Sequence, residues 1–417
     1  MKINLLTRTF SSLSVKNFRY FWLGQCVSVM GTWIQRTASI WLAYRLTGSA
    51  FLVGLLTAGQ FIPILALTLI AGSFSDRFSK KKILIITQST FLLLGLIMTL
   101  LVFFKVIVYG EILLIVIVYG IFQSLDTTAR QSYVFELVGQ KNLLNGISLN
   151  SSIFNLARII GPGLAGMLIV TVGMTWCFFL DTVSYLAVLT GLFLIHQKNT
   201  PVFHHAKTNL IFQIKIGLKY VFSHPDIKLS AWLMLIICSL DFNMNVIAPI
   251  YAKTVLHSGA QVYSNILSAT GVGSLIGAFL MSYLARLGVK KRMYLTVGIG
   301  TSFLQCGMFF IHTYLLSLLV MVGAGFCNMI FLNQSNASFQ FDIPNNLRGR
   351  IMSVYVLLNQ GTTPIGSLYA GGVMDLTSGQ FGFPACGLAA IIGMIIILLI
   401  QKKTVISWTQ RPKTTKV

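Results

Sequence analysis

The chain carries the segment Gly72-Ser-Phe-Ser-Asp76-Arg77-Phe-Ser-Lys80-Lys81-Lys82 between two long apolar runs. Apolar runs of about 20 residues, the length that a helix needs to cross a bilayer, recur on both sides of this segment. The sequence therefore predicts an all-α integral membrane protein with twelve transmembrane helices, at approximately 20–45, 51–74, 83–104, 111–130, 145–171, 175–195, 229–252, 262–284, 293–312, 315–337, 350–374 and 382–401.

Composition and charge also indicate a membrane protein. Of the 417 residues, 55% are hydrophobic and 10% are charged, whereas about 25% of the residues of a soluble domain are charged. The net charge of +22 comes from cations in short loops rather than along one soluble face, so the positive-inside rule explains it better than a nucleic-acid partner does. Residues 1–19 are polar and basic and hold no cleavable signal. We expect both termini in the cytoplasm.

The longest polar stretch, residues 197–228, follows the sixth predicted helix. Within it, the apolar residues of 210–222 recur at helical spacing with Lys215 and Lys219 between them, which predicts an amphipathic helix on the membrane surface. We expect four parts: an N-terminal six-helix bundle at 1–196, a cytoplasmic linker at 197–228, a C-terminal six-helix bundle at 229–401 and a basic cytoplasmic tail at 402–417.

Metal, cofactor and enzyme chemistry are not expected. The tandem His204 and His205 of the linker have no carboxylate or cysteine near them, and the six cysteines are scattered singly through apolar segments. The sequence holds no Walker loop, His-x-x-x-His helix or Gly-x-Ser-x-Gly motif. We interpret the histidines as part of a solvated linker and the cysteines as core residues.

The two halves of the chain look like duplicates. Three features of the first half recur at nearly one offset: the basic triplet 80–82 at 290–292, Leu-x-Gly 144–146 at 347–349, and Pro162 at Pro364. These offsets, all close to half the chain, predict two six-helix bundles related by an axis along the membrane normal.

The segment from Gly72 to Lys82 resembles the signature loop of the major facilitator superfamily, which follows the second of twelve helices. In that family the acid of the loop anchors charge pairs and helix-end dipoles at the cytoplasmic entrance and helps to latch the two halves together. Ser79 replaces the glycine usual in this loop, and Arg286 stands where the second copy would have an acid. The resemblance implies a cytoplasmic gate that includes Gly72, Asp76, Arg77, Lys80 and Lys81.

Two further blocks are similar to the branch of this superfamily that holds the macrolide exporters and the enterobactin exporter. One is Asp126-Thr-Thr-Ala-Arg130-Gln-Ser, and the other runs from Leu149 to Gly166. The second block contains Gly161-Pro162-Gly163, which matches the antiporter motif of the fifth helix. Small residues there permit close helix approach and the proline lets the helix bend, although both are common in membrane helices. The likeness covers nearly the whole chain and implies a proton-coupled exporter of the bacterial inner membrane.

Asp126 and Arg130 lie one helical turn apart, so their side chains can form an ion pair. They stand near the cytoplasmic end of the fourth predicted helix. We interpret the pair as part of the gate or as a brace, in preference to a contact with the substrate.

Charged residues at membrane depth are the main candidates for function, because each costs at least about 2.5 kcal/mol to insert. Arg36 shares a helix face with Trp33 and Gln25, an arrangement that suits an amphiphilic or anionic solute. The alternative is an arginine satisfied by carbonyl groups or by an acid across the bundle.

Two acids in apolar helices are candidates for proton coupling. Asp241 is the first choice, with Asn243 and Asn245 close by; the alternative is an aspartate paired with Arg36 or Arg158. Asp181, one turn before Tyr185, is the second choice.

Amides form polar stripes on the fifth and tenth predicted helices. They suit neutral polar solutes, although each amide alone also serves as a bond between helices. The predicted substrate cavity comprises Gln25, Trp33, Arg36, Asn150, Asn155, Arg158, Asn243, Asn245, Asn333 and Asn336.

These patterns predict a secondary active transporter, a proton-coupled exporter of a small amphiphilic molecule such as a drug or siderophore, working by rocker-switch alternation. Its expected partners are the lipid bilayer, the solute and protons, and it is expected to be a monomer. A nutrient importer or lipid flippase of the same fold is an alternative. A membrane scaffold or sensor that transports nothing is another.

Overall fold

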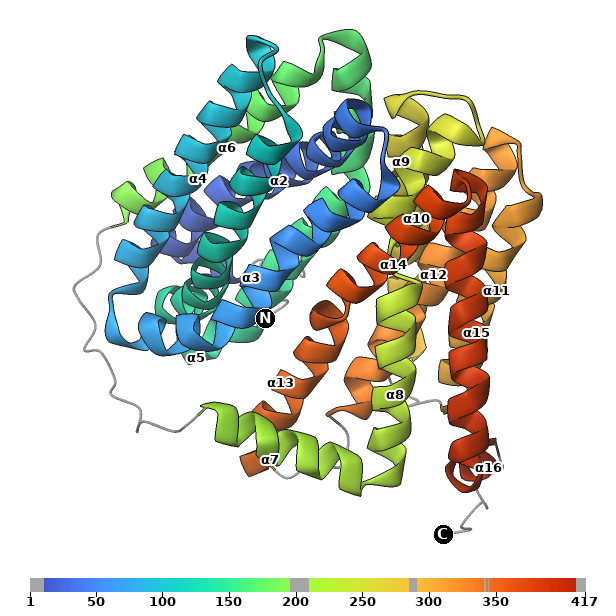
Figure 1. The fold of residues 1–417 in the computed structure, drawn as a ribbon. Helices are drawn as coiled ribbons and strands as arrows, with labels where there is room; N and C mark the ends of the chain where they lie inside the picture. The colour runs from blue at the N-terminus through green and yellow to red at the C-terminus, as the bar shows by residue number, and fades with distance from the viewer. Residues whose placement is uncertain (1–10, 196–209, 285–290, 341–342, 344, 410–417) are drawn as a thin grey trace, which may run out of the picture. The chain divides into compact units, whose positions relative to one another are not determined.

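The computed structural model describes residues 11–195, 210–284, 291–340, 343 and 345–409, and throughout these ranges the regular structure is helical (Figure 1). Single turns of 3-10 helix lie at Ser11–Ser14, Met308–Phe310 and Gly379–Phe381. The longer helices are α2 (Lys16–Thr47), α3 (Ala50–Arg77), α4 (Lys80–Phe103), α5 (Tyr109–Thr171), α6 (Met174–Leu194), α7 (Leu210–Ser223), α8 (Pro225–Leu240), α9 (Met244–Thr254), α10 (Ala260–Leu284), α11 (Lys291–Gly307), α12 (Tyr314–Ser338), α13 (Asn345–Gly361), α14 (Thr363–Leu376), α15 (Gly382–Ile400) and α16 (Lys402–Thr409).

The predicted all-α membrane architecture is confirmed. Among the described residues, ten helical segments are long and apolar enough to cross a membrane. Gly139 has a φ of 66° and divides α5 into two of them, Tyr109–Gln140 and Asn145–Thr171, where the sequence predicts the fourth and fifth spans. Two predicted spans are not among the ten. One lies in α2, whose polar residues lower its hydropathy, and the other is split between α13 and α14, so the number twelve stays a prediction.

Two of the predicted helices are each broken in two. The break in the eleventh falls at Thr362, two residues before Pro364, which has no backbone N–H to donate. The seventh is broken between Leu240 and Met244, so Asp241 lies in a turn rather than in the middle of a continuous helix. There the Asn243 amide donates to the carbonyls of Ser239 (2.6 Å) and Leu240 (3.1 Å) and so satisfies acceptors at the end of α8.

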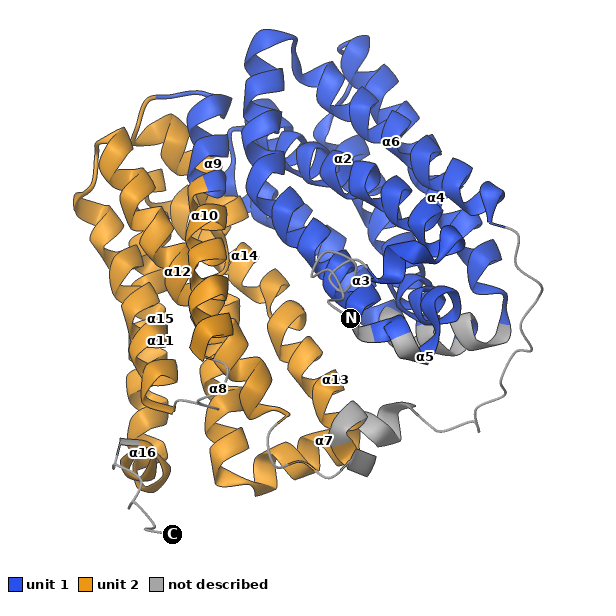
Figure 2. Ribbon diagram, turned by 180° about the vertical axis from the view of Figure 1, so that it is seen from behind, with its two compact units in different colours: residues 1–207, 258–268 blue, residues 208–257, 269–417 orange. Residues whose placement is uncertain are grey.

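The chain forms two compact units (Figure 2). Unit 1 comprises residues 1–207 and 258–268, and unit 2 comprises 208–257 and 269–417. In unit 1, α2 and α4 each pack against both α5 and α6. In unit 2, α11 packs against α12 and α15, α8 packs against α14 and α15, and α7 packs against α13.

Each unit has its own apolar core and also carries large apolar side chains on its outside. Phe18, Phe21 and Tyr133 are buried in unit 1, and Met234 and Phe331 are buried in unit 2. The exposed apolar side chains include Phe193 in unit 1 and Phe279, Leu399 and Ile400 in unit 2. An apolar exterior around helices that satisfy their own backbone groups is what a bilayer requires.

Candidate functional site

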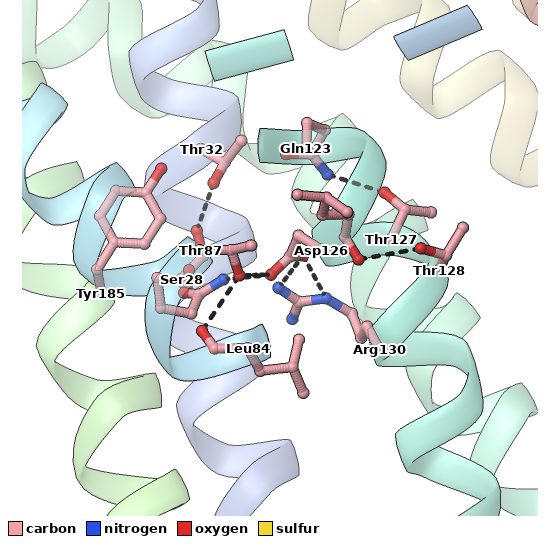
Figure 3. Close-up of polar contacts among 12 residues, drawn as sticks. Ser28, Thr32, Leu84, Thr87, Gln123, Asp126, Thr127, Thr128, Arg130 and Tyr185 are labelled. Carbon is pink, nitrogen blue, oxygen red and sulfur yellow. Dashed lines mark hydrogen bonds and ion pairs between the residues drawn. The ribbon is translucent and has the colours of Figure 1, made fainter. Parts of the chain in front are cut away.

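The buried ion pair predicted between Asp126 and Arg130 is confirmed, and it is part of a larger network (Figure 3). The Nε and Nη2 atoms of Arg130 donate to Oδ2 of Asp126, at 2.9 and 2.5 Å. From α4, Thr87 Oγ1 (2.9 Å) and Gln88 Nε2 (2.8 Å) donate to the other carboxylate oxygen. Asp126 is 1% exposed and Arg130 9%. Four donors therefore satisfy one buried carboxylate and join α4 to α5.

Arg36 lies among aromatic side chains of unit 1. One of them is Trp33, which the sequence predicts on the same helix face as Arg36. Its guanidinium carbon is 5.7 Å from the centroid of the Trp33 ring and 5.2 Å from that of Phe61 on α3. Among the described residues, its Nε has no hydrogen-bond partner. Arg36 also lines a cavity of about 20 Å³ between α2, α3 and α5, with Gln60 and Tyr119 among its neighbours. This cavity has room for a water molecule but not for a solute of many atoms.

Gln25 and Arg158, two further members of the predicted cavity, hold polar atoms that lack partners among the described residues. Gln25 is completely buried, and neither its Oε1 nor its Nε2 forms a hydrogen bond. Arg158, on α5, is half-buried and its Nε is unpartnered. Buried polar atoms of this kind are expensive, and they often mark places where water or a ligand binds.

The tripeptide Gly161-Pro162-Gly163 lies where α5 passes very close to α2. A Cβ atom added to Gly161 would stand 2.6 Å from the Cβ of Trp33. At Gly163 an added Cβ would stand 3.1 Å from Ser268 Oγ, which also belongs to unit 1. In this unit, the small residues therefore allow the helices to approach closely, as expected.

Asp181, in α6, is 1% exposed and belongs to a chain of hydroxyl groups. Tyr185 donates to its Oδ2 at 3.2 Å, and the hydroxyls of Tyr185 and Tyr119 are 3.0 Å apart. Its Oδ1 has no partner among the described residues. The sequence predicts the contact with Tyr185, because the two residues are one turn apart, but not the contact with Tyr119 of α5.

Asp241 is completely buried at the break between α8 and α9. Its Oδ2 accepts a hydrogen bond from Ser302 Oγ (2.7 Å), and its backbone carbonyl accepts one from Gln305 Nε2 (2.7 Å); both donors lie on α11. Its Oδ1 has no partner among the described residues. Within unit 2, the one described partner of this carboxylate, Ser302, is therefore neutral.

Some of the predicted amides bond within their own helices and others bond neighbouring helices, since Asn328 of α12 accepts a hydrogen bond from Thr301 Oγ1 of α11 at 2.6 Å. Asn155 donates to the carbonyl of Ser151 and Asn333 to that of Met329, each at 2.9 Å, while Asn336 accepts from Gln340. Asn150 and Asn245 are half-buried on α5 and α9. An amide that bonds its own helix adds no link between helices.

Most of the segment predicted as a charged loop is helical, because Gly72, Asp76 and Arg77 belong to the end of α3 and Lys80 and Lys81 to the start of α4. The side chains of Asp76 and Arg77 lie outside the described part of the chain. Further along, Lys80 pairs with Glu136 on α5 at 3.5 Å. Lys81 donates to the carbonyl of Ile195, which ends α6, at 2.8 Å.

The contact between Lys81 and α6 was not predicted, because the sequence relates Lys81 to Lys291 but names no partner for either lysine. The repeat offset pairs Lys81 with Lys291, and Lys291 also binds at the end of its unit, to Asp226 at 2.7 Å. The second lysine of the basic triplet thus holds a helix end in each half of the chain.

Comparisons with known proteins agree with this architecture. Residues 7–415 match the family described as transmembrane secretion effector, a division of the major facilitator superfamily. The match covers nearly the whole chain, as the sequence resemblance predicts. A bacterial homologue of the human lysosomal transporter Spinster has a TM-score of 0.72 at 12% identity, covering 95% of this chain and 99% of that one. At this identity the likeness shows the fold alone.

Three curated relatives cover most of the chain at low identity. The staphyloferrin A transporter of Staphylococcus aureus is 22% identical, covering 92% of this chain and 96% of its own. The multidrug efflux pump Tap of Mycolicibacterium fortuitum is 23% identical, covering 88% and 92%. The enterobactin exporter of Salmonella typhimurium is 24% identical, covering 87% and 85%.

Proposed function

Because the chain belongs to the transmembrane secretion effector family of the major facilitator superfamily, we propose that this membrane transporter is a proton-driven exporter of a small amphiphilic molecule. The names of its relatives support a siderophore or a drug as the solute, since they include a staphyloferrin A transporter, an enterobactin exporter and a multidrug efflux pump. Bacterial relatives support a place in the inner membrane. We expect a monomer with both termini in the cytoplasm.

The burial of Asp241 is the main support for the proposal that transport is coupled to protons. The one described partner of its carboxyl group within unit 2, Ser302, is neutral, and the other carboxyl oxygen has no partner among the described residues. Protonation of this group therefore breaks no ion pair there, unlike protonation of Asp126, which Arg130 holds. Asp181, bonded to Tyr185, is the second proton site that we propose.

We assign solute binding to the predicted cavity residues and gating to the charged loop. Arg36 supports this assignment most directly, because its guanidinium faces two aromatic rings and keeps one donor unused. In the rocker-switch mechanism, two bundles alternate between facing inward and facing outward. Asp126 and Arg130 brace α4 against α5 so that the first bundle moves as a rigid body, and Asp76 latches the entrance.

Transport by the full-length protein in proteoliposomes tests this function. We expect an imposed pH gradient to drive the movement of enterobactin, staphyloferrin A or a macrolide, and a protonophore to abolish it. The substitution Asp241→Asn should reduce transport to the rate measured without a gradient, while exchange of solute at equal pH continues. Asp375→Asn is the matched control, because it neutralises an exposed acid of the same unit.

Proton coupling is contradicted if the protonophore leaves transport unchanged, and Asp241 is the wrong site if its variant still responds to the gradient. The direction of net flux decides between export and nutrient uptake. Movement of a labelled phospholipid instead of these solutes would indicate a flippase. A scaffold or sensor would move none of these molecules.

A further inference from the structure

The last described helix, α16, is fixed to the rest of unit 2 by a three-residue cluster. Trp408 Nε1 donates to Asp226 Oδ1 at 2.6 Å, and Lys291 Nζ donates to Asp226 Oδ2 at 2.7 Å. Lys291 Nζ also lies 5.5 Å from the centroid of the Trp408 ring, and Trp408 is only 4% exposed. These contacts hold α16 against the first turn of α8 and the start of α11. They also engage both oxygens of the Asp226 carboxylate.

A groove of about 650 Å³ lies beside this cluster, between the junction of α7 with α8 and the junction of α15 with α16. Figure 2 shows these helix ends at the same end of unit 2. Its volume falls within the range of about 300–1,000 Å³ that ligand pockets typically have. Its lining includes three lysines and three large apolar residues: Lys228, Lys402, Lys403, Phe222, Ile400 and Ile406.

The groove lies where two candidate membrane spans meet the polar surface. The span Pro225–Thr254 begins at its edge, and the span Gly379–Ile400 ends there. The apolar lining remains accessible, since Ile400 is 76% exposed and Phe222 is 45% exposed. A groove at this depth faces lipid headgroups on one side and acyl chains on the other.

The positive charge of the groove is not neutralised by the described residues. None of the ion pairs in the described ranges includes Lys228, Lys402 or Lys403. The nearby acid, Asp226, is already bound to Lys291. The start of α16 adds partial positive charge, because its first backbone bond is that of Val405 to the carbonyl of Gln401, at 3.1 Å, and the amides of 402–404 precede it.

We propose that this groove binds an anionic phospholipid, with the phosphate of the headgroup among the three lysines and an acyl chain along the apolar residues. Charge and depth together favour a lipid over a free anion, because a free phosphate would not use Phe222, Ile400 and Ile406. Basic pockets between helices at the cytoplasmic surface are suited to such headgroups. The residues after α16 carry the same sign of charge as the groove, which disfavours the chain's own end as the occupant. The site does not depend on the proposed export activity.

Native mass spectrometry of the full-length protein in detergent tests the site with two added lipids, phosphatidylglycerol and phosphatidylcholine. The double substitution Lys402→Gln/Lys403→Gln should raise the Kd for phosphatidylglycerol about tenfold or more, because the charge of each lysine near an anionic headgroup contributes to the free energy of binding. Its Kd for phosphatidylcholine should stay unchanged. The matched control is Lys215→Gln/Lys219→Gln, which removes two exposed charges from α7 of the same unit but none from the lining.

Any one of three results with the double variants would overturn the proposal. The first is an equal loss of phosphatidylglycerol in both double variants, because general attraction to the surface would explain it. The second is no loss in the groove variant. The third is displacement of the lipid by millimolar inorganic phosphate, which would indicate a site for the free anion. If the double variant does not fold, Lys402→Gln and Lys403→Gln are measured singly, each with an expected increase in Kd of about fivefold. An unchanged Kd in both single variants also overturns the proposal.

Discussion

Replacing Arg130 with methionine tests whether the network around Asp126 braces unit 1. The substitution removes two charge-assisted hydrogen bonds, at 2.9 and 2.5 Å, and leaves a carboxylate that is 1% exposed without its cation. Breaking a buried pair by removing one partner costs about 3–5 kcal/mol. Thr87 and Gln88 still donate to the other oxygen, so we expect a loss near the lower end, about 3 kcal/mol in the free energy of unfolding.

The double variant Asp126→Asn/Arg130→Met shows whether stability is lost because a charge is left unpaired or because the packing around residue 130 is damaged. It removes both charges, and the asparagine oxygen can still accept from α4, so we expect most of the lost stability to return. Unfolding of the purified protein in a titration with sodium dodecyl sulfate measures the free energies of the wild type, both single variants and the double variant. The reasoning is refuted if Arg130→Met costs less than about 1 kcal/mol, or if the costs of the two single changes simply add.

Two further predictions concern local packing and helix ends. Gly161→Ala should cost about 1–3 kcal/mol in the free energy of unfolding because the new methyl group collides with α2; Gly110→Ala, also in α5 but with open space around it, should cost little in the same titration. Lys81→Gln should destabilise the end of α6 by about 1 kcal/mol through loss of the bond to Ile195, measured by amide hydrogen exchange, whereas Lys82→Gln should not. Equal effects of the two lysine substitutions would show that the carbonyl contact does not matter.

Local spacing predicts the contacts that lie within one helix. Asp126 and Arg130 are four residues apart, as are Asp181 and Tyr185, and in both cases the structure has the contact that this spacing allows. The hydrogen bonds that join different helices were not predicted. Thr87 lies 39 positions from Asp126, and nothing in its own surroundings marks it as a partner.

The breaks in the helices show a second limit of sequence patterns. Hydropathy predicts one span at 229–252 because its residues are apolar almost throughout. At the break, the amide of Asn243 bonds two carbonyls that a continuing helix would need, and hydropathy does not register such a contact. The break near Thr362 was easier to anticipate, since Pro364 follows it. Asp241 was thus a correct candidate for burial, but its place at the end of α8 was not foreseen.

The two repeats use one lysine position in chemically different ways, and this makes their response to ionic strength unequal. Lys81 binds a neutral peptide carbonyl, whereas Lys291 binds a carboxylate whose side chain is 54% exposed. The Debye length falls from about 30 Å at 0.01 M salt to about 8 Å at 0.15 M, and exposed pairs weaken accordingly. A rise in ionic strength would therefore weaken the link between α8 and α11 that Lys291 and Asp226 form, while the bond of Lys81 to the end of α6 would change little.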